Sequence, residues 1–451
     1  MVLCFAKFRF RARKLGESFA KHEPRHLRSL LRVHKRKYLE EMKMKKIIAL
    51  LLALAMVAAL FVGCGEKTEK ITLTVWGPAA DQDPATGNWL KTMCDKFNEQ
   101  HPEWDITFEY GVCGENDAAT KVTADPSAAG DVYFFANDQI GNLLRANAIA
   151  EFGGKNLDAI KAGSSEAMLG SVTYTDGGVY GVPFTGNTWF MMYNKSVYTE
   201  EDIKSLDTML SKGKVAFNTG DGWYLASFYV ANGGTLYGET GIDAAAGIDF
   251  GGEKGLAVTN YLVDMCNNPN YIVDANNEVG LSLMAEGGCD AFFSGTWKAD
   301  AAKAALGENF AAAQLPTITI NGEAKQMKSF AGSKAIAVNP NCKNPAAAAA
   351  LAVFLGSAEA QLAHYEMCGV IPCHPELTTN ETIMSDPVAK AQLDVIANTS
   401  VTQPLVPDMG ANYWTPAGNF GGELNSKTIT HENAEEKTQA FVDAINGKGG
   451  L

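Results

Sequence analysis

Apolar and polar positions along the chain follow two spacings in turn, which predicts strands alternating with helices. Residues 71–76 alternate apolar and polar side chains, as a half-buried strand does, and residues 106–110 repeat the pattern. Between them, the apolar residues of 89–100 recur at helical spacing. A strand, a helix and a second strand in this order are typical of the start of an α/β lobe.

The same patterns continue through the rest of the chain. Apolar runs that end in small or polar residues predict further strands at 131–136, 189–193, 215–217 and 291–297. Helical spacing predicts helices over 138–147, 200–214, 257–266, 281–286, 345–355 and 387–396. Ligands of open α/β sheets bind beyond the carboxyl ends of the strands. Polar and aromatic residues that directly follow these strands are therefore candidate ligand contacts.

Residues 181–195 predict that the chain passes from one packed body to another. The segment begins with an extended stretch fixed by Pro183, continues through the small polar residues 185–188, and enters the apolar run 189–193. A few small residues between two strands can absorb the φ and ψ changes of a hinge.

This segment resembles a signature of the extracellular solute-binding proteins of ABC sugar transporters, a family that includes maltodextrin-binding proteins. The resemblance rests on Pro183, the polar segment after it and the run Met-Met-Tyr-Asn-Lys at 191–195, with departures at Phe190 and Tyr198. Further motifs follow in family order over residues 70–448. The resemblance implies an α/β fold with two lobes, of the periplasmic-binding-protein type, with three interlobe crossings.

The organisation expected from the resemblance and from composition has several parts. Residues 1–41 are interpreted as upstream read-through or a disordered segment, 42–63 as a lipoprotein signal peptide and 64–70 as a tether. The N-lobe is expected to contain residues 71–185 and 335–385, and the C-lobe residues 186–334 and 386–448.

Residues 42–64 have the pattern of an export signal. Three lysines precede an apolar run of sixteen residues, 47–62, which is shorter than the ~20 residues of a membrane span. The end of this segment, Leu-Phe-Val-Gly-Cys at 60–64, resembles a bacterial lipobox and implies lipidation of Cys64, although Phe61 stands where leucine is preferred. An uncleaved N-terminal anchor is the alternative, and both interpretations place the rest of the chain outside the membrane.

The distribution of charge excludes one class of partner. Residues 1–63 have 15 Lys and Arg against 4 acidic residues, whereas the remainder has 23 against 47. An acidic body repels phosphates, so we do not expect nucleic-acid binding. Seven cysteines follow Cys64, too many to pair completely within one chain, and their spacing is not that of a zinc ribbon.

Candidate ligand contacts of the N-lobe follow two of its strands. Residues 134–139 resemble the family's apolar-aromatic-Ala-x-Asp pattern, which implies that Phe135 stacks on a sugar and that Asp138 binds hydroxyls, with Gln139 beside them. Trp76 and Asp81 follow the first strand and are expected at the rim. The alternative for Asp138 is a helix cap, which is compatible with a ligand contact.

The C-lobe candidates come from three separate segments and from the crossing. Asp221 and Trp223 follow the strand at 215–217, Trp297 follows the strand at 291, and Trp414 closes a segment that begins at Pro404. The resemblance implies that Asp221 supplies a carboxylate and that the three tryptophans form an aromatic wall. Asn187, in the crossing, is expected to add a polar contact. A tryptophan outside such motifs more often packs in a core than contacts a ligand.

These residue types predict a carbohydrate ligand. Aromatic rings cover the apolar faces of a sugar, and carboxylates accept hydrogen bonds from its hydroxyls. By resemblance we expect maltooligosaccharides, ABC permease subunits as partners, and a monomer held by its lipid at the extracellular face of the cytoplasmic membrane. No cofactor, metal ligand or catalytic residue is expected, and His364 and His374 are interpreted as surface or core residues. The alternatives are another oligosaccharide, a polyamine, a glycan-capture module without a permease, or a secreted glycan-cleaving enzyme.

Overall fold

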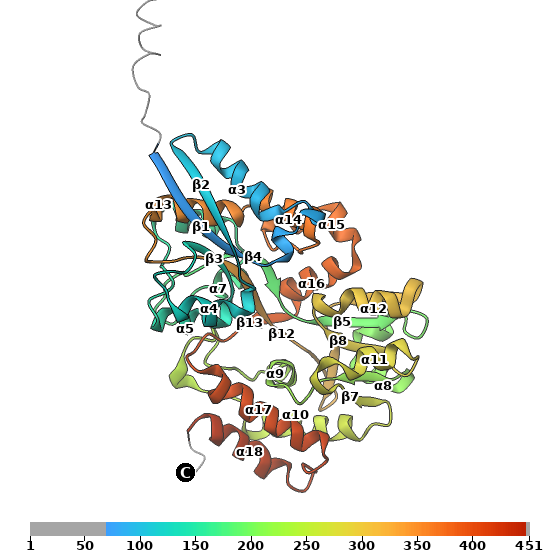
Figure 1. The fold of residues 1–451 in the computed structure, drawn as a ribbon. Coiled ribbons are helices and arrows are strands. Elements are labelled where there is room, and N and C mark those ends of the chain that lie inside the picture. The colour runs from blue at the N-terminus through green and yellow to red at the C-terminus, as the bar shows by residue number, and fades with distance from the viewer. Residues whose placement is uncertain (1–68, 448–451) are drawn as a thin grey trace, which may run out of the picture. The chain divides into compact units, whose positions relative to one another are not determined.

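The computed structural model describes residues 69–447, which form two bodies with separate hydrophobic cores (Figure 1). The expected signal peptide, the lipidation of Cys64 and the interpretation of residues 1–41 lie outside the described residues. Both bodies have an open sheet covered by helices, so the predicted two-lobed α/β fold is confirmed. The predicted domain boundaries stay predictions.

The N-lobe sheet has the strand order β13–β12–β3–β1–β2, and β4 also pairs with β12. Its strands are β1 (Glu69–Gly77), β2 (Trp104–Val112), β3 (Val132–Ala136), β4 (Val182–Asn187), β12 (Ser329–Val338) and β13 (Ser400–Thr402). Because β1 runs parallel to both β2 and β3, their carboxyl ends meet at one edge. The helices of this lobe are α3 (Trp89–Gln100), α4 (Ala118–Ala124), α5 (Ile140–Arg145), α6 (Gly154–Ala162), α7 (Glu166–Gly170), α13 (Pro345–Leu355) and α14 (Ala358–Cys368).

The C-lobe sheet has the order β7–β6–β8–β5–β9, with a separate hairpin of β10 and β11. Its strands are β5 (Phe190–Asn194), β6 (Val215–Phe217), β7 (Tyr271–Val273), β8 (Ala291–Ser294), β9 (Phe310–Ala313), β10 (Thr317–Ile320) and β11 (Glu323–Gln326). The remaining helices are α8 (Leu206–Lys212), α9 (Gly222–Ala231), α10 (Gly252–Asn267), α11 (Val279–Ala285), α12 (Ala299–Leu306), α15 (Glu381–Ser385), α16 (Pro387–Asn398), α17 (Thr415–Asn425) and α18 (Ala434–Ile445).

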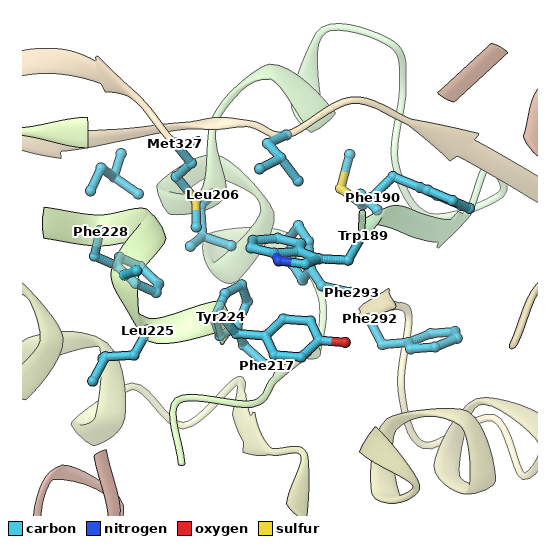
Figure 2. Packing of buried hydrophobic residues seen from close by; sticks show 14 of the residues in the cluster. Trp189, Phe190, Leu206, Phe217, Tyr224, Leu225, Phe228, Phe292, Phe293 and Met327 are labelled. Atoms are coloured by element: carbon cyan, nitrogen blue, oxygen red, sulfur yellow. The ribbon is translucent and has the colours of Figure 1, made fainter. Parts of the chain in front are cut away.

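Trp189 lies in the C-lobe core, directly after the polar segment of the crossing (Figure 2). Its ring contacts Tyr224 of α9 at a centroid distance of 4.9 Å, and it packs edge-to-face on Phe217 and Phe293. Burying several aromatic rings in mutual contact is a large source of apolar stabilisation. The first residue beyond the crossing is therefore held firmly in the second lobe.

The strands that connect the lobes contact one another. Between β4 and β5, the buried hydroxyl of Thr188 lies 2.8 Å from the hydroxyl of Ser329, the first residue of β12. Residues 400–402 lie in the range 386–448 that was predicted for the C-lobe. They form β13, which pairs with β12 on the N-lobe sheet. A strand of three residues is too short to produce a readable alternation, which is why the sequence pattern missed it.

Two further properties of the described residues bear on the chemistry of the chain. The seven cysteines within 69–447 are all free, and six of them are buried. No single helix in this part of the chain is long and apolar enough to cross a membrane. Helices α13 and α14 together have the required length and composition, but they are bent by 59° at their junction.

Two adjacent glycines of α17 predict opposite effects on stability. A Cβ at Gly421 would lie 1.8 Å from the backbone oxygen of Thr219, whereas a Cβ at Gly422 would meet no atom within 4 Å. We expect Gly421→Ala to lower the free energy of unfolding by about 1–3 kcal/mol, because the helix must move off the loop that carries Asp221. Gly422→Ala should raise it by about 0.5–1 kcal/mol, because alanine favours a helix interior.

Denaturant unfolding of both variants against the parent protein measures this difference. Equal effects of the two substitutions would contradict the close contact between α17 and the loop after β6.

Candidate functional site

Two tryptophans of the C-lobe lie face to face at one edge of its sheet. Strands β6 and β8 are parallel neighbours, so the residues that follow them come out at the same edge. Trp223 lies in the first turn of α9, after β6, and Trp297 lies in the short turn Thr296–Lys298, after β8. Their ring centroids are 6.1 Å apart, with the planes inclined by 29°. The sequence prediction that these segments converge is thus consistent with the geometry.

Among the described residues 69–447, Trp297 is one of four large apolar side chains that are exposed to solvent. Its exposed fraction is 51%, whereas Trp223 is half-buried beside it. A large exposed ring stacked on a second ring forms a flat apolar surface, and such surfaces mark binding sites. The pair is therefore available to a ligand face.

Trp414 lies beside the same turn of α9. It ends a π-helical turn, Gly410–Trp414, and its ring packs edge-on to Phe330 at 5.9 Å. A Cβ at Gly222 would lie 2.7 Å from Cβ of Ala417 and 3.4 Å from Cε3 of the Trp414 ring, so a side chain at this position would collide with the start of α17. The three predicted C-lobe tryptophans therefore lie around the start of α9.

Gln403 connects this aromatic group to the strands between the lobes. Nε1 of Trp223 donates a hydrogen bond to Oε1 of Gln403 at 3.3 Å. A Cβ placed on Gly332 of β12 would lie 2.6 Å from this Oε1 atom of Gln403. It would also lie 3.0 Å from Oδ1 of Asn137 and 3.1 Å from the backbone oxygen of Asn187. Three polar groups thus converge over one glycine, at a position we call the Gly332 junction.

Asn137 is the buried member of the Gly332 junction. Its Nδ2 donates to the backbone oxygen of Ser171 at 2.9 Å, and its Oδ1 accepts from the backbone nitrogen of Ser333 at 3.1 Å. Asn187, the last residue of β4, pairs with Gly332 and is partly exposed. The Gly332 junction therefore joins the segment that leads to Asp138, the end of β4 at Asn187, and Gln403, the hydrogen-bond partner of Trp223.

Within residues 69–447, two carboxylates of the predicted site form no ion pair with a lysine or arginine. Burial among neighbouring protein atoms raises the pKa of Asp138, although part of its side chain is exposed to solvent. Burial also raises the pKa of Asp221, partly opposed by a hydrogen bond from the backbone nitrogen of Trp223 at 2.8 Å. No lysine or arginine contributes to either shift. Carboxylates of this kind are ready acceptors for hydroxyl donors.

The structure contradicts the prediction for Phe135. Its side chain is fully buried, edge-on to Tyr133 at 6.2 Å, and its ring would lie 3.0 Å from a Cβ at Gly181. Strand β3 is central in its sheet with both faces covered, so all five of its side chains are buried. The ring belongs to the N-lobe core and cannot stack on a sugar.

Asp81 and Gln139 also have internal partners in place of the predicted ligand contacts. Asp81 is 3% exposed, and its Oδ1 lies 2.9 Å from Nε2 of His364, so its prediction as a rim residue is wrong. The side-chain amide of Gln139 accepts from the backbone nitrogen of Ala119 and donates to the backbone oxygens of Glu115 and Asn116. Its polar atoms organise this loop, which contradicts a direct role in binding.

Trp76 remains an untested prediction. It is partly exposed at the end of β1, opposite Gly111 of β2. Its ring would lie 2.3 Å from a Cβ at Gly111 and 2.8 Å from one at Gly130, so it lies flat against backbone that lacks side chains. These contacts fix the ring on the surface of the N-lobe sheet.

Gln403 is the residue of this site that the sequence analysis missed. It directly precedes Pro404, the first residue of the segment 404–414 that the resemblance singled out. Its position just before this segment is the feature of the sequence that could have identified it. Strand β13, which ends one residue earlier, was not predicted.

Comparison with known proteins places the chain in a family. A family model described as bacterial extracellular solute-binding protein matches residues 92–391. A galactooligosaccharide-binding protein of Bacillus subtilis is 26% identical over 90% of this chain and 98% of its own length. A maltooligosaccharide ABC transporter solute-binding lipoprotein of Streptococcus pneumoniae is also 26% identical, over 86% of this chain and 96% of its own.

Solved structures show the same similarity. A structure determined with acarbose is 51% identical in sequence, with a TM-score of 0.74, and covers 84% of this chain and 99% of its own. The maltodextrin-binding protein MalE1 of L. casei, determined without ligand, is 28% identical with a TM-score of 0.77, and covers 84% and 99%.

The raised pKa of Asp138 predicts a measurable effect on stability. A carboxyl whose folded-state pKa lies above its unfolded value favours the protonated form, so the ionised form destabilises the folded state at neutral pH. We expect Asp138→Asn to raise the Tm at pH 7 and to lose this advantage as the pH falls through the raised pKa. Asp105→Asn, which removes an exposed aspartate of β2, is the control and should show no such pH dependence.

Thermal unfolding across pH 3–8 measures both variants. A lower Tm for Asp138→Asn at neutral pH would show that the carboxylate is satisfied within the fold and is not poised for a ligand.

Proposed function

Because the chain belongs to the bacterial extracellular solute-binding protein family, we propose that it captures maltooligosaccharides outside the cell and delivers them to the permease of an ABC importer. The observation that carries the proposal is the stacked pair of Trp223 and Trp297, with Trp297 half in solvent. A glucan chain presents C–H faces that match such plates and hydroxyls that match the carboxylates of Asp138 and Asp221.

The similarity to known proteins supports this class of ligand. Acarbose is an α-linked, maltotetraose-like pseudo-oligosaccharide, and the structure determined with it is 51% identical to this chain. Two relatives named for maltooligosaccharides come from S. pneumoniae strains, both at 26% identity. The galactooligosaccharide-binding relative has the same identity, so galactooligosaccharides are the second candidate ligand.

The mechanism follows from the positions of the candidate contacts. Asp138 follows a strand of the N-lobe, whereas the tryptophans and Asp221 belong to the C-lobe. A sugar that touches both sets of residues makes all its contacts only when the lobes are closed, so binding shifts the population toward the closed form. The Gly332 junction and the Thr188–Ser329 contact lie in the segments that connect the lobes, where the hinge of this motion is expected. The closed form then docks on the permease, and the chain itself performs no catalysis.

The polar groups of the site have separate roles in this mechanism. The Oδ1 atom of Asp221 is committed to the backbone nitrogen of Trp223, which leaves Oδ2 for a sugar hydroxyl. The hydrogen bond from Trp223 to Gln403 fixes the plane of the indole ring, so stacking requires little reordering. Asn187 offers an amide at the base of the cleft.

Calorimetric titration tests the ligand and the site together. The panel contains maltose, maltotetraose, an isomaltooligosaccharide, a xylooligosaccharide, a galactooligosaccharide and spermidine. We expect maltotetraose to bind most tightly, and Trp297→Ala or Trp223→Ala to weaken it at least tenfold, because each removes a stacking face whose burial contributes more than about 1.4 kcal/mol. Tyr110→Ala removes an exposed ring of β2, remote in sequence from every candidate contact, and should leave binding unchanged.

Three outcomes would change the proposal. Unaltered maltotetraose affinity in both tryptophan variants would remove the site, and tighter binding of galactooligosaccharide or spermidine would replace the ligand. Release of shorter sugars from maltotetraose would instead identify a glycan-cleaving enzyme.

We also propose that the protein is held at the outer face of the cytoplasmic membrane by a lipid on Cys64. The lipobox-like residues 60–64 and the relative named a lipoprotein support this anchor. Expression of the full chain in a bacterial host should place it in the membrane fraction, and Cys64→Ala should remove incorporation of labelled fatty acid. Cys113→Ala is the control and should keep the label. Equal labelling of the Cys64→Ala variant would contradict the anchor.

A further inference from the structure

Three side chains of the N-lobe with metal-binding chemistry come together outside the candidate sugar site. His364 and Cys368 are four residues apart on α14, so they lie on the same face of this helix. Asp81 comes from the short turn Ala80–Gln82, which follows β1. One potential ligand atom from each residue lies within 4.8 Å of the other two.

We propose that Asp81, His364 and Cys368 bind one zinc ion, which ties the loop after β1 to helix α14. Nitrogen, sulfur and carboxylate oxygen are the donor set that zinc prefers, and it accepts three protein ligands with a fourth position for water. Bonds of about 2.0–2.3 Å hold tetrahedral ligands less than about 4 Å apart. The observed separations therefore need only small side-chain movements.

The imidazole of His364 is fixed in orientation before any ion binds. It stacks on Trp89 with the ring centroids 3.7 Å apart and an angle of 7° between the planes. Phe184 packs against it at 5.6 Å. Trp89 is itself anchored, since its Nε1 donates to the backbone oxygen of Ala360 at 3.0 Å. Because two aromatic side chains pack on the imidazole, its ring nitrogens have a fixed orientation. Little side-chain entropy is then lost when a metal ion binds, which favours binding.

The buried atoms of this cluster are not satisfied by the protein alone. Asp81 is 3% exposed and His364 is 1% exposed. Oδ2 of Asp81 and Nδ1 of His364 have no hydrogen-bond partner, although both atoms are buried. Within residues 69–447, the charged partner that the structure gives Asp81 is His364, and no lysine or arginine reaches this carboxylate. A buried carboxylate of this kind needs a positive charge nearby.

The contact between Asp81 and His364 holds two potential ligand atoms close together. Oδ1 of Asp81 and Nε2 of His364 are 2.9 Å apart, and in the tautomer that carries its hydrogen on Nε2 the imidazole donates to the carboxylate. A zinc ion that binds Oδ1 and Nε2 replaces this hydrogen bond, and the ring then carries its hydrogen on Nδ1.

Cys368 completes the cluster from its solvent side. It is partly exposed, whereas Asp81 and His364 are buried, so an ion can reach the cluster past its sulfur. Its sulfur lies within 4.8 Å of a potential ligand atom of each of the other two residues.

The experiment measures metal binding by the folded full chain. The protein is treated with a chelator, desalted and titrated with Zn²⁺, and bound metal is counted by mass spectrometry of the desalted sample. We expect one zinc per chain and a rise in Tm with zinc, because an ion that binds only the folded state stabilises it. With Co²⁺ we expect sulfur-to-cobalt charge transfer in the near ultraviolet and the visible bands of tetrahedral cobalt.

Matched variants connect the metal to these residues. Cys368→Ser and His364→Gln should each weaken zinc by more than about 100-fold, beyond the 10–100-fold that loss of an outer partner causes. His101→Gln and Cys342→Ser, two other N-lobe residues, should bind as the parent does. Far-ultraviolet circular dichroism verifies the fold of each variant, and the cobalt spectrum of the parent protein tests the site where a variant fails to fold.

The proposal does not depend on the identity of the sugar. Absence of retained zinc, a cobalt spectrum without sulfur-to-metal charge transfer, or equal zinc affinity in Cys368→Ser would overturn it. The pair of Asp81 and His364 would then be a proton-bridged contact within the core.

Discussion

The buried amide of Asn137 is the contact on which the arrangement of the site depends. It joins the end of β3 to α7 through Ser171 and to β12 through Ser333. A buried amide that loses such partners costs about 1–3 kcal/mol, so the three segments are held as one unit. Asp138 follows Asn137 along the chain, and Oε1 of Gln403 approaches Oδ1 of Asn137 at Gly332. The segments that follow β3 and β13 therefore meet at β12.

In the C-lobe, exposed aromatic rings pack on buried ones, so the exposed rings are held in fixed positions. Tyr224 packs on Trp189 beneath the start of α9, and both are fully buried. Trp223, one residue earlier, is half-buried, and Trp297 stacks on it from outside. From Trp189 and Tyr224 through Trp223 to Trp297, the rings become progressively more exposed while each contacts the next. The exposed ring therefore has a rigid support. The carboxyl of Asp221 caps the same helix start through the backbone nitrogen of Trp223, whereas burial raises its pKa.

Much of the fold was predictable because its strands and helices are long and regular in pattern. The helix predicted over 89–100 has the bounds of α3, and the strand predicted over 106–110 lies within β2. Strand β13 was not predictable, since three residues carry no periodicity and its existence depends on pairing with β12. The register of β12 with both β3 and β4 is a tertiary property that no local pattern encodes.

The candidate site was predictable to a similar degree and for a similar reason. Family resemblance named Trp223 and Trp297, and their common position agrees with the rule that parallel strands bring their carboxyl ends to one edge. The same rule failed for Asp81, whose partner His364 is 283 positions away along the chain. It also failed for Phe135, because the last residues of a central strand remain inside the sheet. Sequence pattern locates the edge of a sheet, whereas packing decides which side chains reach solvent there.

The free cysteines give the folded protein a chemical property that its unfolded chain lacks. Burial raises the pKa of Cys94, Cys289, Cys342 and Cys373 to about 12. These four thiols therefore form the reactive thiolate much less readily in the folded protein than in the unfolded chain. At these positions, disulfide exchange with oxidants consequently occurs mainly in chains that have not yet folded. After export, the yield of active protein is a competition between the rate of folding and the rate of thiol oxidation.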